Sequence, residues 1–207
     1  MNSAFKSLTA AALLLGSANV FAASSVDLTV KGLITPSACT PALSGGGTID
    51  YGKISAKDLN ADQSTDLPMQ TLQFTVTCDA ATLVAMEAKD NREGSDSNND
   101  SMEFGLGLIN GTEKLGGMQL RLVSSVADGV PVSTVGSYDD GKTWGYELAL
   151  MRGNLIAPAV AGVNAPIPVQ AWNADLRVQP FIAKTSGLTL TNEVAIDGSV
   201  TLTVRYL

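Results

Sequence analysis

Apolar and polar residues alternate with a period of two in several short stretches of this sequence. Such alternation predicts β-strands that bury one face and leave the other in water, as antiparallel sheets allow. Gly, Asn, Asp and Pro separate the stretches, and helical periodicity is nearly absent. About ten short strands predict an all-β fold built as a two-sheet sandwich. The clearest predicted strands are 26–30, 72–78, 118–122 and 200–206, and the weaker ones are 82–88, 104–109, 144–151, 167–172, 176–184 and 188–196.

The first 22 residues have the three parts of a secretory signal peptide. Lys6 supplies a positive charge, an apolar stretch begins at Leu8, and small residues lie around Ala22. The alternative, a membrane-anchoring helix, needs about 20 apolar residues, and this run is broken by Ser17 and Asn19. We therefore expect export with cleavage after Ala22. The rest of the chain, 23–207, is predicted to form one domain with a full core.

The 207-residue chain has two cysteines, no histidine and a net charge of −7. Residues 1–22 carry one lysine and no acid, so their removal changes the charge to −8. This acidic balance argues against nucleic acid or an anionic membrane as partner, because phosphate binding needs a basic surface. In an oxidising compartment Cys39 and Cys78 are predicted to form a disulfide. Without histidine no Ser-His-Asp or Cys-His arrangement is possible, and we expect no metal, no cofactor and no enzymatic activity.

Residues 137–144 match a short named motif. Their spacing, S-x-D-x-G-x-T-W, resembles the Asp box of sialidase β-propellers, where the box is a structural hairpin remote from the chemistry. Asp139 can accept hydrogen bonds from the turn backbone, Gly141 can take a positive φ, and Trp144 can pack on a sheet. Sialidases repeat the box over several blades and need a longer chain. We therefore predict a structural hairpin here and no active site.

Two other segments are predicted to be loops. Residues 89–101 are polar and rich in turn formers, which favours a mobile surface loop. Asp96, Asn98 and Asp100 have the alternate spacing of a calcium loop. However, the sixth position of that pattern is Ser101 where a glycine is required, and the twelfth is Gly107 where a bidentate glutamate is required. Residues 152–166 mix Gly, Pro, Asn and Ala and are predicted to be a flexible connection between strands.

The order of several segments resembles the subunits of chaperone–usher fimbriae, the pilins. Residues 30–39 resemble the pilin strand that leads to the first cysteine, and residues 49–59 resemble a pilin stretch with an aromatic-Gly pair followed by an aliphatic residue. Residues 74–78 resemble the strand that ends at the second cysteine, and residues 167–171 resemble the strand that follows the late loop. Residues 198–207 resemble the C-terminal strand, which has alternating apolar residues and a penultimate Tyr.

This resemblance implies an immunoglobulin-like sandwich that lacks its last strand. A hydrophobic groove then takes the place of that strand, and it is filled first by a periplasmic chaperone and later by the N-terminal arm of another subunit. The partners implied are the chaperone, an outer-membrane usher and other fimbrial subunits, and the location is the periplasm and then the cell surface. The groove residues implied are Val200, Leu202, Val204 and Tyr206, and the donor arm, within 23–30, carries Val26, Leu28 and Val30.

Two alternatives and one departure from the pilin pattern stay open on the sequence alone. In a complete sandwich, the apolar residues of 200–206 would be ordinary core residues. The arm before Val30 is shorter than the usual pilin arm, so it can act as donor only by including residues that otherwise begin the first strand. An adhesin-type binding module would use Trp172 and the 89–101 loop to hold a carbohydrate or protein ligand. The main hypothesis is a structural subunit of a fimbria or fimbria-like surface fibre.

Overall fold

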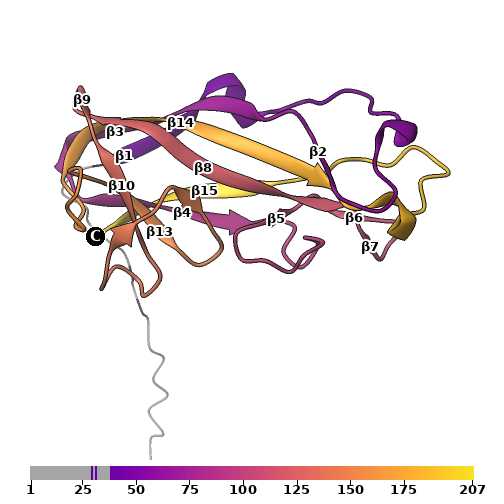
Figure 1. Ribbon diagram of the computed structural model, residues 1–207. Coiled ribbons are helices and arrows are strands. Elements are labelled where there is room, and N and C mark those ends of the chain that lie inside the picture. The colour runs from indigo at the N-terminus through magenta and orange to yellow at the C-terminus, as the bar shows by residue number, and fades with distance from the viewer. Residues whose placement is uncertain (1–28, 30, 32–37) are drawn as a thin grey trace, which may run out of the picture. The chain divides into compact units, whose positions relative to one another are not determined.

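The computed structural model describes residues 29, 31 and 38–207. This part of the chain is all-β, as predicted, and its strands pair antiparallel in two packed sheets (Figure 1). The predicted signal peptide and the donor-arm residues Val26, Leu28 and Val30 lie outside the described residues. Its short 3-10 turns are η1 (Ser44–Gly47), η2 (Ala56–Asp58) and η3 (Thr185–Gly187).

The first sheet contains the longest strands. Its main path is β1 (Cys39–Leu43), β3 (Gln70–Thr82), β14 (Val169–Ile182), β8 (Gly116–Ala127) and β12 (Ala149–Leu150). Short strands extend it: β2 (Thr65–Asp66) pairs with β14, and β5 (Phe104–Gly105) and β9 (Val130–Pro131) pair with β8.

The second sheet has the order β11 (Gly145–Tyr146), β10 (Ser133–Ser137), β13 (Leu155–Ala159), β4 (Val84–Asp90) and β15 (Val200–Tyr206). A separate hairpin is made by β6 (Leu108–Ile109) and β7 (Glu113–Lys114). In an immunoglobulin sandwich the strands A, B, E and D form one sheet and C, F and G the other. β1, β3, β14 and β8 have the A-B-E-D order, and β4 and β15 have the places of C and F. Within 38–207, no strand occupies the place of G beside β15.

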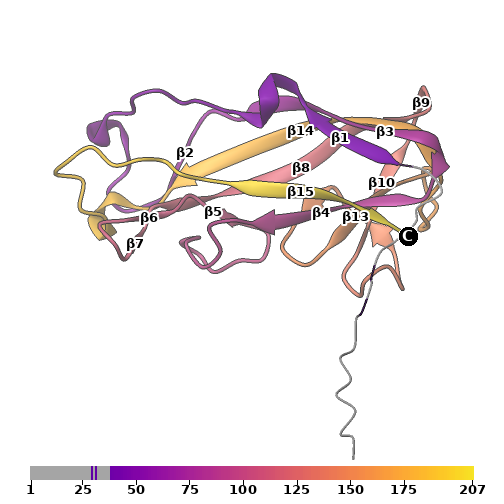
Figure 2. The same ribbon diagram turned by 180° about the vertical axis from the view of Figure 1, so that it is seen from behind.

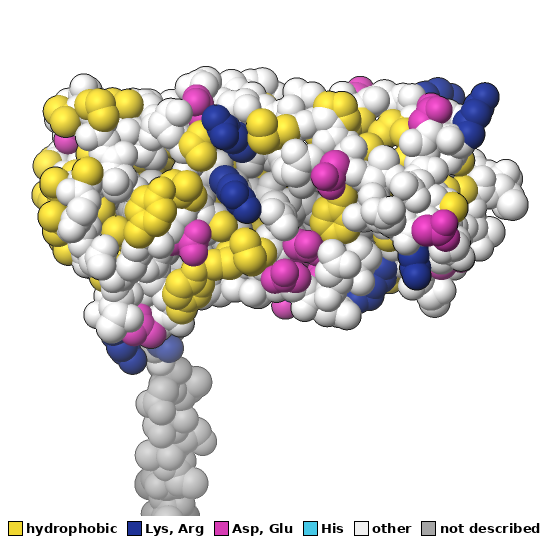
Figure 3. All heavy atoms as spheres, in the orientation of Figure 1, with side chains coloured by type: hydrophobic (Ala, Val, Ile, Leu, Met, Phe, Trp, Pro, Cys, Tyr) yellow, Lys and Arg dark blue, Asp and Glu magenta, His cyan; other side chains and the backbone are white. Residues whose placement is uncertain are grey.

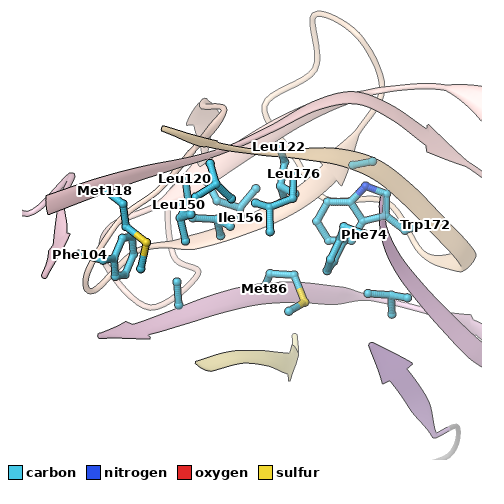
Figure 4. Close-up of a cluster of buried hydrophobic side chains, with 14 of the residues drawn as sticks. Phe74, Met86, Phe104, Met118, Leu120, Leu122, Leu150, Ile156, Trp172 and Leu176 are labelled. Carbon is cyan, nitrogen blue, oxygen red and sulfur yellow. The ribbon is translucent and has the colours of Figure 1, made fainter. Parts of the chain in front are cut away.

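The main core fills the space between the two sheets (Figure 4). Trp172 on β14 and Phe74 on β3 are fully buried and meet edge to face, with ring centroids 5.1 Å apart. From the opposite sheet, Met86 and Ile156 contribute side chains that are 0% exposed. These residues belong to the alternating positions of their strands, so the period of two in the sequence selects the face that is buried.

A second, smaller cluster lies on the outer face of the second sheet. Along β4 and β13, consecutive residues belong to different clusters, which places them on opposite faces. Trp144, from the end of the 137–144 turn, packs against the outer cluster and covers it. Its buried members are Ala85, Val135, Leu155, Ala157 and Ala159.

Several predicted boundaries were wrong. The predicted strands 167–172 and 176–184 are one strand, β14, because Asn173 and Asp175 fall on its outward-facing positions and do not break it. The segment 188–196 is not a strand, since no other strand pairs with it. The predicted connection 152–166 contains the buried strand β13, and 144–151 divides into β11 and β12.

The 89–101 segment was predicted to be a mobile surface loop, yet part of it is anchored in the protein interior. Asp90 Oδ2 accepts a hydrogen bond from the Gly105 N–H, and Ser95 Oγ accepts one from the Gly107 N–H. Asp96 is 1% exposed and pairs with Arg152, with 3.2 Å between Oδ1 and Nη1. Burial of an acidic group requires such a partner, so this loop is held to the sandwich by its polar side chains.

Candidate functional site

Two strands at the edges of the two sheets have a free side. β15 pairs with β4 and β1 pairs with β3, and within 38–207 neither has a ladder partner on its other edge. Both edges lie on the same side of the molecule, where β14 and β8 are visible between them (Figure 2). They meet at one end, where the Cys39 N–H donates a hydrogen bond of 2.9 Å to the Tyr206 hydroxyl. Away from this contact the space between them is open.

This space is an apolar groove, which we call the β1–β15 groove. Its inner half has a cavity volume of about 240 Å³. The inner face of the first sheet forms the floor, Leu43 and the segment after β1 form one wall, and β15 with the residues before it forms the other. The apolar lining includes Leu43, Ile49, Tyr51, Leu72, Leu120, Leu176, Val178, Ile196, Val200 and Leu202.

The groove continues beyond β15 into a wider outer half of about 520 Å³. Ile49, Tyr51 and Ile196 line both halves, so the two are continuous. Here the walls are the segments 49–59 and 190–196, and neither segment belongs to a strand. Lys53 and Glu193 lie on opposite walls and form an ion pair of 3.2 Å, with side chains 86% and 80% exposed. An ion pair this exposed adds little stability. It lies at the solvent-facing entrance of the β1–β15 groove.

The inward-facing residues of β15 are less buried than those of its neighbour. Val84 and Met86 on β4 are 0% exposed, whereas Val200, Leu202 and Val204 are only partly buried although they pack on the same core. Tyr206, the fourth predicted groove residue, is 43% exposed. Val200 and Leu202 line the groove directly. The last strand therefore presents an apolar face that nothing else in the described chain fully covers.

Tyr51 is fixed in one wall of the groove. Its hydroxyl donates a hydrogen bond of 2.8 Å to the Pro68 carbonyl, and burial raises the pKa of this phenol. The tyrosine remains neutral at any ordinary pH, because its normal pKa is already about 10. The ring therefore acts as an apolar wall with its polar atom satisfied.

The predicted disulfide is confirmed. Cys39 on β1 and Cys78 on β3 are directly opposite in the ladder and are bonded, with an S–S distance of 2.05 Å. The bond ties the edge strand β1 to the centre of the first sheet at the closed end of the groove. It therefore fixes the same residue whose N–H binds Tyr206.

The 137–144 turn has the hydrogen bonds of a closed hairpin. Asp139 Oδ1 accepts hydrogen bonds from the Lys142 and Thr143 N–H groups, and Oδ2 accepts one from the Thr143 hydroxyl. These bonds, together with one from Ser137, lower the pKa of Asp139 to about 2. Gly141 has a φ of +85°, and its carbonyl accepts a hydrogen bond from the Trp144 indole. Every carboxylate oxygen of Asp139 is thus engaged within the turn, and its structural role stays a prediction.

Trp172 is unable to bind a ligand at the surface. It is 0% exposed, and its indole N–H points to Ser125 Oγ at 3.4 Å. In the calcium-like spacing of the loop, Asp96 faces Arg152 and Asn98 donates to the Glu103 carboxylate. Among the residues that the structure describes, no cluster of three His, Cys, Asp or Glu side chains is arranged to hold a metal ion.

Sequence reasoning missed the groove walls outside β15. Ile49, Tyr51, Leu190 and Ile196 line the cavity, yet only the C-terminal strand was predicted to face it. The available signal was the apolar alternation in 188–196, which predicted a strand there, and the alternate apolar residues Ile49 and Tyr51. The sequence does not show that such an extended segment lacks a partner.

Comparison with known proteins finds distant relatives. Residues 28–121 match a family described as protein of unknown function (DUF1120). The chain is 27% identical over 243 aligned residues to "Protein GltF" of Escherichia coli (strain K12), covering 95% of each chain. It is 27% identical over 221 residues to "Uncharacterized protein YhcF" of the same organism, covering 90% of this chain and 92% of the relative. In the described residues, no helix is long and apolar enough to cross a membrane.

Proposed function

We propose that this chain is a structural subunit of a fimbria or fimbria-like surface fibre, and that its β1–β15 groove accepts an extended strand from another chain. The observation that carries the proposal is an apolar groove that lies between two free strand edges, where an immunoglobulin sandwich has its G strand. The proposed role uses shape and backbone pairing and requires no catalytic group.

A β-strand suits this groove for two physical reasons. The free edge of β15 offers N–H and C=O groups that an incoming strand can pair with, and such edges are otherwise prone to aggregation. Between the walls, alternate side chains of that strand would cover Leu72, Leu176 and Leu202. Burial stabilises by roughly 1.5–3 kcal/mol for each large aliphatic side chain, so three or four of them would contribute as much as the whole stability of a small domain.

The proposed incoming strand is the arm before β1. Val26, Leu28 and Val30 have the alternate spacing that successive pockets along a groove require. Before assembly, a periplasmic chaperone would occupy the groove, and an outer-membrane usher would guide the exchange. These partners are implied by the resemblance to pilins, and export is implied by the signal-peptide pattern of residues 1–22.

A peptide titration tests strand binding. A labelled peptide of residues 23–36 should bind the purified protein and saturate at one strand per chain. A receiving chain with Leu28→Asp in its own arm removes competition from that arm. The peptide with Leu28→Asp should lose binding, because it places an unpaired charge in an apolar pocket. The matched peptide with Thr29→Asp carries the same charge on its outward face and should bind normally. No binding, or equal binding by both acidic peptides, would refute the strand-acceptor function.

Export is tested by mass. The intact protein recovered from the periplasm should begin at Ala23 and should take up no alkylating agent before reduction, because both cysteines are paired. A chain that retains residues 1–22 would contradict the proposed route.

A further inference from the structure

The wall of the outer groove that contains residues 188–196 is held by side chains and not by a strand ladder. Leu188 and Leu190 pack on the main core, but the segment has no strand partner in the described chain. It follows η3 directly, and Figures 1 and 2 both show η3 beside the small β6–β7 hairpin. That hairpin belongs to neither main sheet.

Two side chains of the β6–β7 hairpin form hydrogen bonds with the main chain of Thr189 in this wall. The Asn110 side-chain amide donates a hydrogen bond of 2.8 Å to the Thr189 carbonyl. Glu113 Oε2 accepts a hydrogen bond of 2.6 Å from the Thr189 N–H. Asn110 Nδ2 also donates to Glu113 Oε2 at 3.2 Å, so the two side chains form one unit. Together they satisfy both backbone groups of Thr189, as a partner strand would.

The electrostatics agree with this geometry. Hydrogen bonds from the Thr189 N–H and hydroxyl lower the pKa of the Glu113 carboxyl below its usual value, with a smaller contribution from Asn110. The glutamate is therefore ionised at neutral pH, and a charged acceptor makes the stronger hydrogen bond.

The hairpin that carries this pair is itself fixed. Asn110 and Gly111 have φ values of +50° and +85°, a conformation that Asn and Gly adopt readily, and they are the central residues of a turn in which the Thr112 N–H donates a hydrogen bond to the Ile109 carbonyl. Ile109, which pairs with Glu113 across the hairpin, is 6% exposed and belongs to the main core. The neighbouring Leu115 is 2% exposed and lines the outer groove. The buried neighbours of Asn110 and Glu113 thus fix the hairpin next to the wall.

The geometry points to Asn110 and Glu113 as positioning residues for strand binding. They hold Thr189, and thereby set the position of Leu190, the adjacent wall residue that lines the outer groove. Within residues 38–207, the other ion pairs at this wall are the exposed Lys53–Glu193 pair and the Arg92–Asp197 pair beyond its end. Without the Thr189 contacts this part of the wall is held mainly by the packing of Leu188 and Leu190, and an incoming strand must order its main chain at a cost in affinity. This inference rests on the proposed function.

The test compares strand binding in hairpin variants. In the receiving chain with Leu28→Asp, Asn110→Ala and Glu113→Ala should each weaken binding of the 23–36 peptide about fivefold, since each removes one hydrogen bond from the wall. Glu113→Gln keeps an acceptor oxygen and should restore most of the affinity. Lys114→Ala is the matched control, because it removes another hydrogen bond of this hairpin, from Lys114 Nζ to Asn99 Oδ1, that does not involve the wall. The peptide affinity of this control should stay within about twofold of the receiving chain without a hairpin substitution.

Hydrogen exchange on the same variants separates the possible failures. Backbone amides of residues 188–196 should exchange faster in Asn110→Ala and Glu113→Ala. Their exchange rates should not change in Lys114→Ala. Faster exchange with unchanged peptide affinity, or unchanged exchange, would overturn the positioning role. Failure of the Leu28→Asp receiving chain without a hairpin substitution to bind the peptide would refute the strand-acceptor function itself, while the exchange rates would still show whether the hairpin holds the wall.

Discussion

The second sheet presents apolar side chains on its outer face and on the groove-facing side of its edge strand β15. The two surfaces differ in which residues cover these side chains. On the outer face, the 137–144 turn folds back so that Trp144 covers small residues such as Ala85 and Ala157. At the inner edge, Val200 and Leu202 line an open groove and stay partly exposed. Within residues 38–207, the sandwich thus covers one apolar surface and leaves the other open. Under the proposed function, a strand from another chain completes the groove, and the following predictions act on one surface or the other.

The largest expected single loss is on the groove side. Replacing both Cys39 and Cys78 by alanine opens a loop with a sequence separation of 39 residues. In the chain-entropy model this lowers the free energy of unfolding by roughly 4 kcal/mol. Chemical denaturation of the variant and of the oxidised parent measures the loss. A change below about 1 kcal/mol would mean that the ladder alone holds β1 in place.

Trp144→Ala removes the cover of the outer cluster. Because this side chain is only partly buried, we expect a loss of about 2 kcal/mol, below the range for fully buried tryptophan. The loss should be the same with and without a bound strand, because the cluster is already closed. Denaturation in the presence and absence of the 23–36 peptide tests this, and a peptide-dependent loss would contradict the separation of the two surfaces.

Leu202→Ala should show the opposite dependence. In the free chain the side chain is partly exposed, so its truncation should cost about 1 kcal/mol. With a strand in the groove the same leucine becomes fully buried, and the cost should about double. The same pair of denaturation curves measures both values. Equal losses in the two states would show that no strand covers Leu202.

The smallest expected effect is a pH dependence at the turn. The pKa of Asp139 is lowered to about 2 by its hydrogen bonds from Thr143 and Ser137. A depressed folded-state pKa stabilises fully above the unfolded value of about 4, and the contribution is lost as pH falls towards 2. Asp139→Asn should therefore melt below the parent at pH 6, and the gap should narrow between about pH 4 and pH 2. Melting curves across this range test it, and a gap that widens in acid would contradict the hydrogen-bond account.

The sequence predicted the sandwich well because a buried face must repeat with the pleat. Residues 72–78, 118–122 and 200–206 all lie within strands, and Cys39 faces Cys78. The alternation of apolar and polar residues identifies the side chains that face the core, but it does not show whether a partner strand exists. The segment 188–196 therefore resembled a strand, although contacts from Asn110 and Glu113, more than 70 positions away, hold it as a groove wall.

Two further errors came from polarity taken by itself. Trp172 was a candidate ligand-binding residue because an aromatic ring can stack on a sugar, yet its indole is buried and its polar neighbours on β14 face outward. The 89–101 segment appeared to be a free loop, yet Asp90, Ser95 and Asp96 each have a partner in the interior. Such long-range polar pairs follow from the fold and leave no local pattern.

The most direct test of the strand-acceptor account adds the missing strand to the chain itself. A second copy of residues 23–36 is joined after Leu207 through a short Gly/Ser linker, so that it can turn back along the free edge of β15. Burial of Val26, Leu28 and Val30 of this copy should raise the melting temperature by about 20 °C. Leu28→Asp in the added copy should abolish most of this rise, and Thr29→Asp should not. If the unextended protein is already a stable monomer and the added strand leaves its melting temperature unchanged, the sandwich is complete without a donor and the account is wrong.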